Sequence, residues 1–364
     1  MFKRLLAALT SVALLAVVAA CSTADGAATT ARQKAGVAMP TQTLERWIRD
    51  GQEVEAQLEA LGYDVTLLYA DDDVPLQVQQ VGQLIDEGVE LLIIGSVDGT
   101  ALKDELARAK AAGIPVIAYD RLIRDSDAVD YYATFDNYQV GVLQATSLLQ
   151  GLGVLDSNGT PTNTADTFAI EIFAGSPDDN NATVFYTAAM SILQPYIDAG
   201  TLVVPSGETG FETVATPAWD ANTAGERMAS LLSSNDTPLD AVLAPNDGIA
   251  RAVLEQSKSA GYGTSSQPLP VVTGQDAEVD SVKSLVAGEQ ASTIYKDTRQ
   301  LAEVAVLMGH YLLQGKQPEV NDTTSYDNGT KVVPSYLLPP RLVTVDNYRE
   351  SLIETGYLSK DELS

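Results

Sequence analysis

The chain has 364 residues, 45% of them hydrophobic, and its 49 acidic side chains outnumber the 22 basic ones. This length favours two domains over one, and a net charge of −27 opposes binding to the phosphate backbone of nucleic acids. His310 and Cys21 are the single residues of their types. They exclude His- or Cys-rich zinc sites and an internal disulfide, and Ser-His-Asp chemistry would have to use His310.

The first 20 residues have the pattern of a signal peptide. Lys3 and Arg4 precede an apolar run that ends at Ala20 and is shorter than a membrane-spanning helix of about 20 residues. Small residues lead into Cys21, as in a bacterial lipobox, where the signal is cut before a cysteine that then carries the lipid. An ordinary signal peptide, with Cys21 left as a free thiol, is the alternative. Cleavage takes the charge from −27 to −29 and leaves residues 21–35 as a lipidated cysteine with a flexible tether.

From Gly36 onward, short β-branched runs alternate with amphipathic stretches. Strands are predicted at Gly36–Met39, Asp64–Leu68, Leu91–Ile94, Pro115–Ala118, Tyr132–Phe135, Phe168–Phe173, Leu202–Val204, Ala241–Leu243 and Pro270–Val272. Helices are predicted at Leu44–Leu61, Leu76–Glu87, Ala101–Ala112, Gln139–Gly151, Val184–Ala199, Ala221–Leu232, Gly248–Gly261, Glu278–Ala287 and Thr298–Gln314. This alternation indicates parallel sheets covered by helices on both faces. The number of strands favours two similar α/β lobes over one sheet.

Polar residues follow several of the predicted strands. Asp120 and Arg121 come directly after one strand, and similar loops lie at Ser96–Gly99, Gly175–Asn181, Pro245–Gly248 and Gly274–Asp276. Because ligands bind at the carboxyl ends of parallel strands, these loops are candidates for a binding site. Asp and Asn also cap helices, which is the alternative for each loop taken alone. Arginine is not an N-cap residue, so Asp120 and Arg121 together favour recognition of adjacent hydroxyl groups.

The two tryptophans occupy comparable places in the two halves of the chain. Trp47 lies at the start of a helix after the first strand, and Trp219 lies in a loop that we expect to be exposed. A neutral sugar offers hydroxyl groups to planar polar side chains and apolar C–H faces to aromatic rings. The polar neighbours of both tryptophans favour stacking on a ligand, with packing in a core as the alternative.

Six runs of sequence resemble the xylose-binding and multiple-monosaccharide-binding periplasmic proteins. They are Met39-Pro40-Thr41 with Glu45-Arg46-Trp47-Ile48, Ala118-Tyr119-Asp120-Arg121-Leu122-Ile123, Tyr131 to Asn137, Gly175 to Asn181, Gly274-Gln275-Asp276-Ala277-Glu278 and Val332 to Leu338. The resemblance covers residues 36–364. It implies the type I periplasmic binding protein fold: two similar doubly wound parallel-sheet α/β lobes, a three-segment hinge and a ligand cleft between the lobes. One lobe would comprise residues 36–135 and 297–337, and the other residues 136–296 and 338–364.

The family pattern, carried over position by position, implies a set of sugar-binding residues. The first lobe would provide Arg46 and Trp47 as a hydroxyl donor and a stacking face, with Asp120 and Arg121 beside them. The other expected residues are Asp179, Asn180, Asn181, Trp219, Asn246, Asp276 and, beside the second hinge segment, Lys296. The remaining hinge segments would lie near Asp136 and near Tyr336-Leu337. Leu44 stands at a position where related receptors vary, which leaves the preference for ring substituents open.

The sequence therefore predicts a monomeric, membrane-anchored extracytoplasmic receptor that delivers a monosaccharide to the permease of an ABC importer. The resemblance implies no catalytic residue, metal or cofactor. A secreted glycosidase or sugar isomerase is the rival, but a glycosidase needs one carboxyl group with a raised pKa. Here the acids accompany Arg46, Arg121 and Lys296, which should keep them ionised. A sugar-responsive transcription factor of the same fold is disfavoured, because the chain has an export signal and lacks a DNA-binding headpiece.

Overall fold

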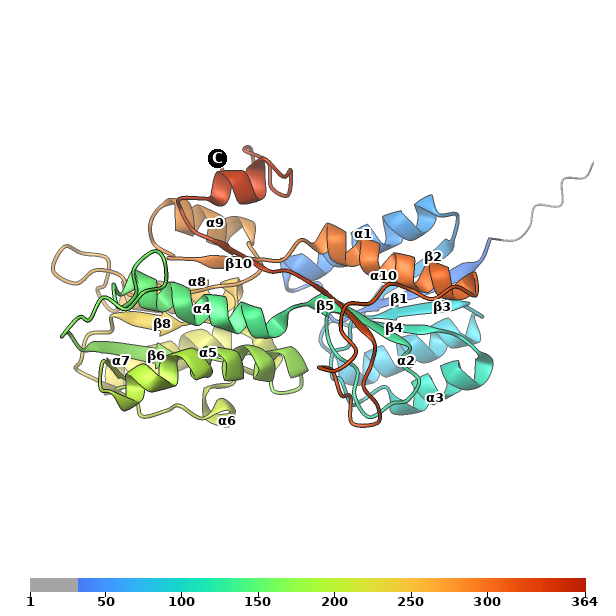
Figure 1. Ribbon diagram of the computed structural model, residues 1–364, viewed down its shortest axis with the longest axis horizontal. Coiled ribbons are helices and arrows are strands. Elements are labelled where there is room, and N and C mark those ends of the chain that lie inside the picture. The colour runs from blue at the N-terminus through green and yellow to red at the C-terminus, as the bar shows by residue number, and fades with distance from the viewer. Residues whose placement is uncertain (1–31) are drawn as a thin grey trace, which may run out of the picture. The chain divides into compact units, whose positions relative to one another are not determined.

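Two separate parallel sheets organise residues 32–364, the part of the chain that the computed structural model describes (Figure 1). The predicted signal peptide and Cys21 lie outside the described residues. No helix in the described part is both long enough and apolar enough to cross a membrane.

The first sheet has the strand order β11-β5-β4-β3-β1-β2, and every neighbouring pair is parallel. Its strands are β1 (Lys34–Met39), β2 (Asp64–Tyr69), β3 (Leu91–Ile94), β4 (Val116–Tyr119), β5 (Tyr131–Phe135) and β11 (Ser335–Leu338). The central strands β3 and β4 are buried at every position, because helices cover both faces of the sheet. The edge strand β2 is only partly buried.

Helices α1 (Glu45–Ala60) and α10 (Thr298–Leu313) pack together on one face of this sheet, while α2 (Val74–Asp86) and α3 (Lys103–Ala112) cover the other (Figure 1). Two apolar clusters follow from this layering. One joins Trp47, Leu58 and Tyr119 to Leu301 on the face of α1 and α10. The other fills the space between the sheet and helices α2 and α3.

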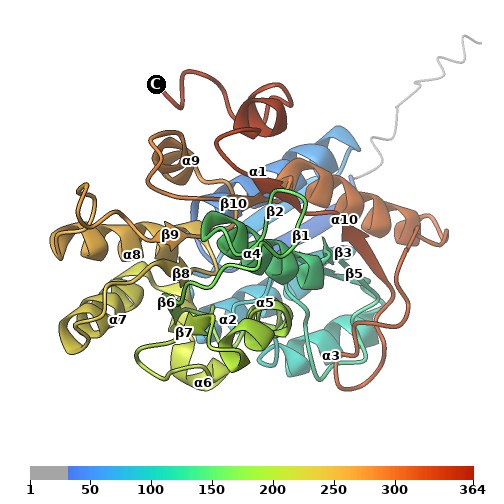
Figure 2. The ribbon, with the colours of Figure 1, turned by 60° about the vertical axis from the view of Figure 1, so that its left-hand side comes forward.

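The second sheet repeats the same winding with the order β7-β6-β8-β9. Its strands are β6 (Phe168–Ile172), β7 (Leu202–Val203), β8 (Ala241–Leu243) and β9 (Val271–Val272). Helices α4 (Asn137–Gly151) and α5 (Asn180–Asp198) lie on one face, and α7 (Ala221–Ser234) packs beside α8 (Asp247–Ser259) on the other (Figure 2). Short elements complete this half of the chain: α6 (Phe211–Val214), the 3-10 turn Pro217–Trp219 and α9 (Val279–Val286).

The chain passes between the two halves three times. The passages are from β5 to α4, from β10 (Thr293–Tyr295) to α10, and from β11 to β12 (Arg341–Val343). Strands β10 and β12 pair antiparallel beside α4 and α9, and a helical turn at Arg349–Ile353 follows them. The nine predicted strands and nine predicted helices are confirmed, with shifted ends, and the prediction of two parallel-sheet lobes is confirmed with them.

The sequence pattern did not indicate β10, β11 or β12. Each has at most four residues, and each gains its hydrogen bonds from a strand distant in the sequence. Ser335 of β11, for example, pairs with Tyr132 of β5. Short strands of this kind have too few positions for a periodic pattern, so tertiary pairing defines them.

Candidate functional site

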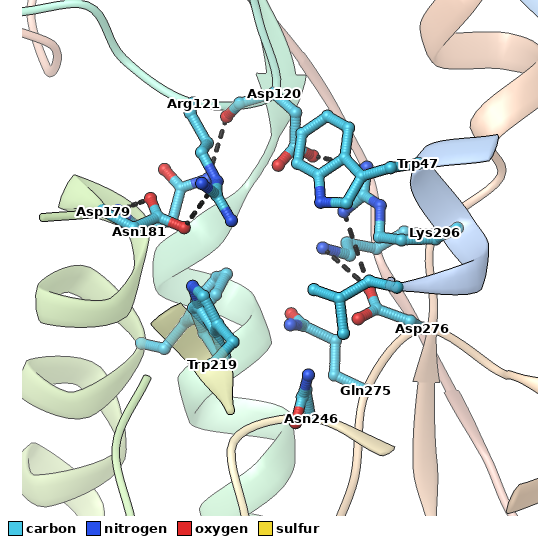
Figure 3. Close-up of a pocket in the computed structure, with 13 residues that line it drawn as sticks. Trp47, Asp120, Arg121, Asp179, Asn181, Trp219, Asn246, Gln275, Asp276 and Lys296 are labelled. Carbon is cyan, nitrogen blue, oxygen red and sulfur yellow. Dashed lines mark hydrogen bonds and ion pairs between the residues drawn. The ribbon is translucent and has the colours of Figure 1, made fainter. Parts of the chain in front are cut away.

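A pocket lies at the carboxyl ends of strands from both sheets (Figure 3). It is lined by Leu44, Arg46, Trp47, Asp120, Arg121, Asp179, Asn181, Phe185, Trp219, Asn246, Gln275, Asp276 and Lys296. The loops after β1, β4, β6, β8 and β9 provide most of these residues, as expected for doubly wound sheets.

Helix capping and pocket lining turn out to be compatible functions of the same side chain. Asp179 caps α5 by accepting a hydrogen bond from the Asn181 amide through Oδ1, while its Oδ2 pairs with Arg121 Nε at 3.1 Å. Asn246 caps α8 by accepting from the Ile249 amide through Oδ1, which leaves its amide nitrogen for the pocket. The cap orients the residue, and the second polar atom remains available.

A chain of ion pairs crosses the pocket from the first lobe to the second. Arg46 pairs with Asp120 at 3.0 Å and faces Asp276 at 3.6 Å, and Lys296 lies 3.1 Å from the same Asp276 carboxylate. All four side chains are buried. Buried charges remain in a fold when they are paired, and these pairs hold their polar atoms in fixed positions around the cavity.

A second set of polar contacts joins the lobes on the side of Arg121. The Arg121 guanidinium donates to the carbonyl oxygens of Ser96 and Val97, which orients it toward Asp179. The Asn181 amide donates to the Asp120 carbonyl oxygen at 2.8 Å. Because Asn181 comes from α5 and Asp120 follows β4, this hydrogen bond links the two lobes directly.

The pKa values of the pocket acids differ although each has a cationic partner. Burial alone would raise the pKa of Asp120, but Arg46, Lys296 and Arg121 outweigh it and hold that pKa below the usual value. For Asp179 burial prevails, so its pKa is raised despite Arg121. The paired cations therefore lower the pKa of Asp120, whereas at Asp179 desolvation exceeds the attraction of one guanidinium and the pKa rises.

Both tryptophans line the pocket and are also packed into a core. Trp47 lies under the guanidinium groups of Arg46 and Arg121, whose central carbons are 4.6 and 5.2 Å from the ring centroid. The Trp219 ring meets Phe185 edge-on, with the two ring centroids 6.5 Å apart, and only 5% of Trp219 is exposed. The loop is exposed at Pro217 and Ala218, as expected, but the Trp219 ring itself is buried because it folds back against Gly175 and α5. In Figure 3 the two indoles lie on opposite sides of the central space.

Three of the lining residues have a backbone conformation that L-residues rarely adopt. The φ angles are 59° at Asp120, 55° at Trp219 and 97° at Asp276. A positive φ at a residue other than glycine costs of order 1–3 kcal/mol, and such residues cluster at functional sites. The fold therefore maintains strain at three positions where a side chain points into this pocket.

Two buried polar atoms of the pocket have neither a hydrogen-bond partner nor an ion-pair partner within residues 32–364. They are the indole nitrogen Nε1 of Trp219, a donor, and the amide oxygen Oε1 of Gln275, an acceptor. An unpaired buried polar group costs about 1–3 kcal/mol. A polar molecule in the pocket would relieve this cost, provided that it carries both donors and acceptors. Within the same residues, His, Cys, Asp and Glu form no group arranged to hold a metal ion.

The pocket contains ten of the eleven pocket residues predicted from the sequence, and Asn180 is not among its lining residues. Asn180 and Asn181 are consecutive at the start of α5, and successive helical residues point in directions about 100° apart. Only Asn181 is therefore directed at the cavity. The sequence analysis missed Phe185, named Gln275 only as part of the candidate loop Gly274–Asp276, and mentioned Leu44 only as a variable position. Phe185 lies one helical turn after Asn181, a spacing that could have indicated it.

These features define a two-lobed α/β binding protein with a buried polar and aromatic cleft. A family model described as a periplasmic binding protein domain matches residues 35–317. The chain belongs to this periplasmic binding protein family.

Individual relatives support the same assignment. The chain is 55% identical over 330 residues to the multiple sugar-binding periplasmic receptor ChvE of Rhizobium radiobacter, covering 90% of this chain and 91% of that protein. It is 51% identical to the multiple sugar-binding periplasmic protein SbpA of Azospirillum brasilense, covering 89% of each. Among solved structures, an ABC transporter solute binding protein from Clostridium phytofermentans with bound β-D-glucose has a TM-score of 0.86 and 45% identity, covering 91% of this chain and all of that one. These three proteins are named as sugar-binding or solute-binding proteins, and the enzyme alternative has no support among them.

Proposed function

We propose that this chain is an extracytoplasmic receptor that captures a neutral monosaccharide of the aldose class and delivers it to the permease of an ABC importer. The observation that carries the proposal is the pocket's combination of paired charges, two indole faces and two unpaired buried polar atoms. The names of the relatives, which describe sugar-binding receptors and a solute binding protein, support the same class of ligand.

The proposed binding mode follows from the hydrogen-bonding capacity of each side chain. Asp120 and Asp276 accept hydrogen bonds from hydroxyl groups, and Arg46, Arg121 and Lys296 donate to them; such charge-assisted bonds are the strong ones. Asn181 and Asn246 donate through their amide nitrogens, and Asp179 fixes Arg121. Gln275 adds the acceptor and Trp219 the donor that lack partners in the described chain. Trp47 and Trp219 cover the apolar faces of the sugar ring.

Pairing within the pocket favours binding over sugar chemistry. Acid catalysis of glycoside cleavage needs a protonated carboxyl group directed at the leaving oxygen and a second carboxylate across the bond. The pKa of Asp120 is lowered by its cationic neighbours, and the raised pKa of Asp179 belongs to a carboxylate that already accepts from the Asn181 amide and pairs with Arg121. Asp120 is thereby suited to accepting from hydroxyl groups, and Asp179 to holding Arg121 in place.

The proposal includes an anchor and a hinge. Cys21 would carry a lipid after cleavage of residues 1–20, which would hold the receptor at the outer face of the membrane as a monomer. The lobes would be bounded at 36–135 with 297–337 and at 136–296 with 338–364. The three chain passages between the lobes would then serve as the hinge.

A thermal-shift and calorimetry panel tests the function. Xylose, glucose, galactose, arabinose, ribose and fucose are added separately to the purified mature protein, and sugar recovery is measured by chromatography. We expect at least one aldose to raise the melting temperature and to bind stoichiometrically with no product formed. Absence of any shift across the panel, or turnover of a sugar, contradicts the proposal.

A further inference from the structure

Asp50 lies behind the pocket and does not line it. It follows Arg46 by one turn of α1, and its side chain has no exposed surface. Its Oδ2 accepts a hydrogen bond from Arg46 Nε at 2.9 Å and lies 2.8 Å from Arg46 Nη2. Its other oxygen accepts a hydrogen bond from the Tyr119 hydroxyl. Asp50 therefore occupies one edge of the Arg46 guanidinium, and Tyr119 secures Asp50 in turn.

This contact determines which way the guanidinium faces. Arginine carries five N–H donors in a rigid planar fork, so fixing one edge directs the remaining donors. With the Nε edge on Asp50, Nη2 reaches Asp120 at 3.0 Å and Nη1 faces Asp276 at 3.6 Å. The same plane lies over the Trp47 ring. Arg46 is buried, so a guanidinium that lost Asp50 would have to seek another acceptor within the pocket.

We propose that Asp50 is the positioning residue for Arg46, and that sugar binding weakens when Asp50 loses its negative charge. The inference rests on the proposed function as a sugar receptor. It adds that affinity depends on a carboxylate that the sugar does not touch.

The environment of Asp50 makes that charge sensitive to mildly acidic pH. Burial raises the pKa of Asp50 to about 6; Arg46 and the Tyr119 hydrogen bond oppose this rise, and the negative charge of Asp120 adds to it. Tyr69 of β2 and Tyr357 of the C-terminal segment also face it electrostatically, and both stay neutral because their own pKa values are raised. Asp50 is therefore ionised above about pH 6 and protonated below it, while the lowered pKa of Asp120 keeps that partner charged. The Arg46–Asp50 ion pair is present above this pH and lost below it.

The test is calorimetric titration of D-glucose and D-xylose into the mature protein at pH 7.5 and pH 5.0. Asp50→Asn, which imitates the protonated side chain, should bind about tenfold more weakly than the wild type at pH 7.5, the lower end for loss of one charge-assisted hydrogen bond. The wild type should lose affinity between pH 7.5 and 5.0, and Asp50→Asn should lose less. Asp179 also has a raised pKa, so the difference between the two profiles isolates the contribution of Asp50.

Three further variants separate positioning from general damage. Asp50→Glu keeps the charge and should restore part of the affinity and the pH dependence. Asp86→Asn removes an exposed carboxylate that pairs with Arg108 on the surface, and it should match the wild type at both pH values. Tyr119→Phe removes the hydroxyl that stabilises ionised Asp50, so it should move the midpoint of the affinity loss to higher pH.

The possible results of these experiments separate the positioning inference from the proposed receptor function. If Asp50→Asn binds with wild-type affinity and an unchanged pH profile, the positioning inference is refuted while the receptor function stands. If Asp50→Asn does not fold, the Tyr119→Phe midpoint decides, and an unshifted midpoint refutes the inference. If the wild type binds none of the six aldoses at neutral pH, the proposed function fails and this inference fails with it.

Discussion

A single added methyl group at Gly175 should disrupt the sugar site. An alanine Cβ built at this position would lie 2.1 Å from Cη2 of Trp219 and 2.3 and 2.4 Å from two further atoms of the same indole. Gly175 does not have the left-handed backbone that disfavours alanine, so the perturbation is the steric contact itself. The loop after β6 therefore needs glycine because the Trp219 ring lies directly on its backbone.

The size of the effect follows from the contact distances. Carbon atoms pack at about 3.5–4.0 Å, so the Trp219 ring must retreat by about 1.4 Å or more. Phe185 and the surrounding core limit that movement on one side, and the pocket is open on the other. Overpacking of this kind costs about 1–3 kcal/mol of folding free energy. A ring pushed into the pocket also takes space from the ligand, and we expect a loss of at least about tenfold in sugar affinity, or about 1.4 kcal/mol.

The assay compares Gly175→Ala with Gly210→Ala by melting temperature, calorimetry and tryptophan emission. Gly210 is a suitable control because its alanine Cβ would have one neighbour, Thr213 Oγ1 at 3.8 Å, and its φ is −80°. Gly175→Ala should lower both the melting temperature and the affinity and should shift the emission spectrum, while Gly210→Ala should change none of them. Wild-type affinity and emission in Gly175→Ala would refute the placement of Trp219 against Gly175 at the edge of the pocket.

Three further predictions concern the charges, the indole and the anchor. Asp120→Ala removes a charged acceptor paired with Arg46 and should weaken binding of the best aldose roughly ten- to more than a hundredfold, measured by calorimetry; unchanged affinity would misplace the site. Trp219→Ala should lower affinity by roughly thirty- to a thousandfold and also cost about 3–5 kcal/mol of stability, because the ring is both a pocket face and a core residue. Chemical denaturation measures the stability and calorimetry the affinity on the same sample, and a loss in only one of the two would contradict this double role. Cys21→Ser should release the receptor from the membrane fraction with sugar binding intact, and retention of the variant at wild-type level in that fraction would argue against the lipobox.

The sequence alone indicated nine of the twelve strands and nine of the ten α-helices of residues 32–364, together with the loops that carry the site. These features depend on local periods: strands such as Leu91–Ile94 are continuously apolar because both faces are buried, and α10 repeats apolar residues along one side. Polar residues at strand ends identified Asp120, Arg121 and Asn246, because parallel strands place their carboxyl ends at one edge of a sheet. Each of these patterns spans only a few consecutive residues, so the sequence by itself shows it.

The tertiary structure alone decided which polar groups meet and with what charge. Asp50 looks like any acid on an amphipathic helix, yet the fold buries it completely beside Arg46 and Tyr119, and this burial raises its pKa to about 6 although both partners oppose the rise. Asp179 and Asp120 both have a cation nearby in the fold, and their pKa values move in opposite directions because the balance of burial and surrounding charge differs between them.

The physical reason is the range of the interactions. Propensity, capping and apolar periodicity act within one or two turns of chain, so the order of residues determines them. Desolvation and Coulomb energy depend on every group within several ångströms, and in this pocket those groups come from segments as far apart as Arg46 and Asp276. The sequence therefore determined the elements and the kinds of side chain at their ends. Folding determined which of those side chains share one water-excluded space.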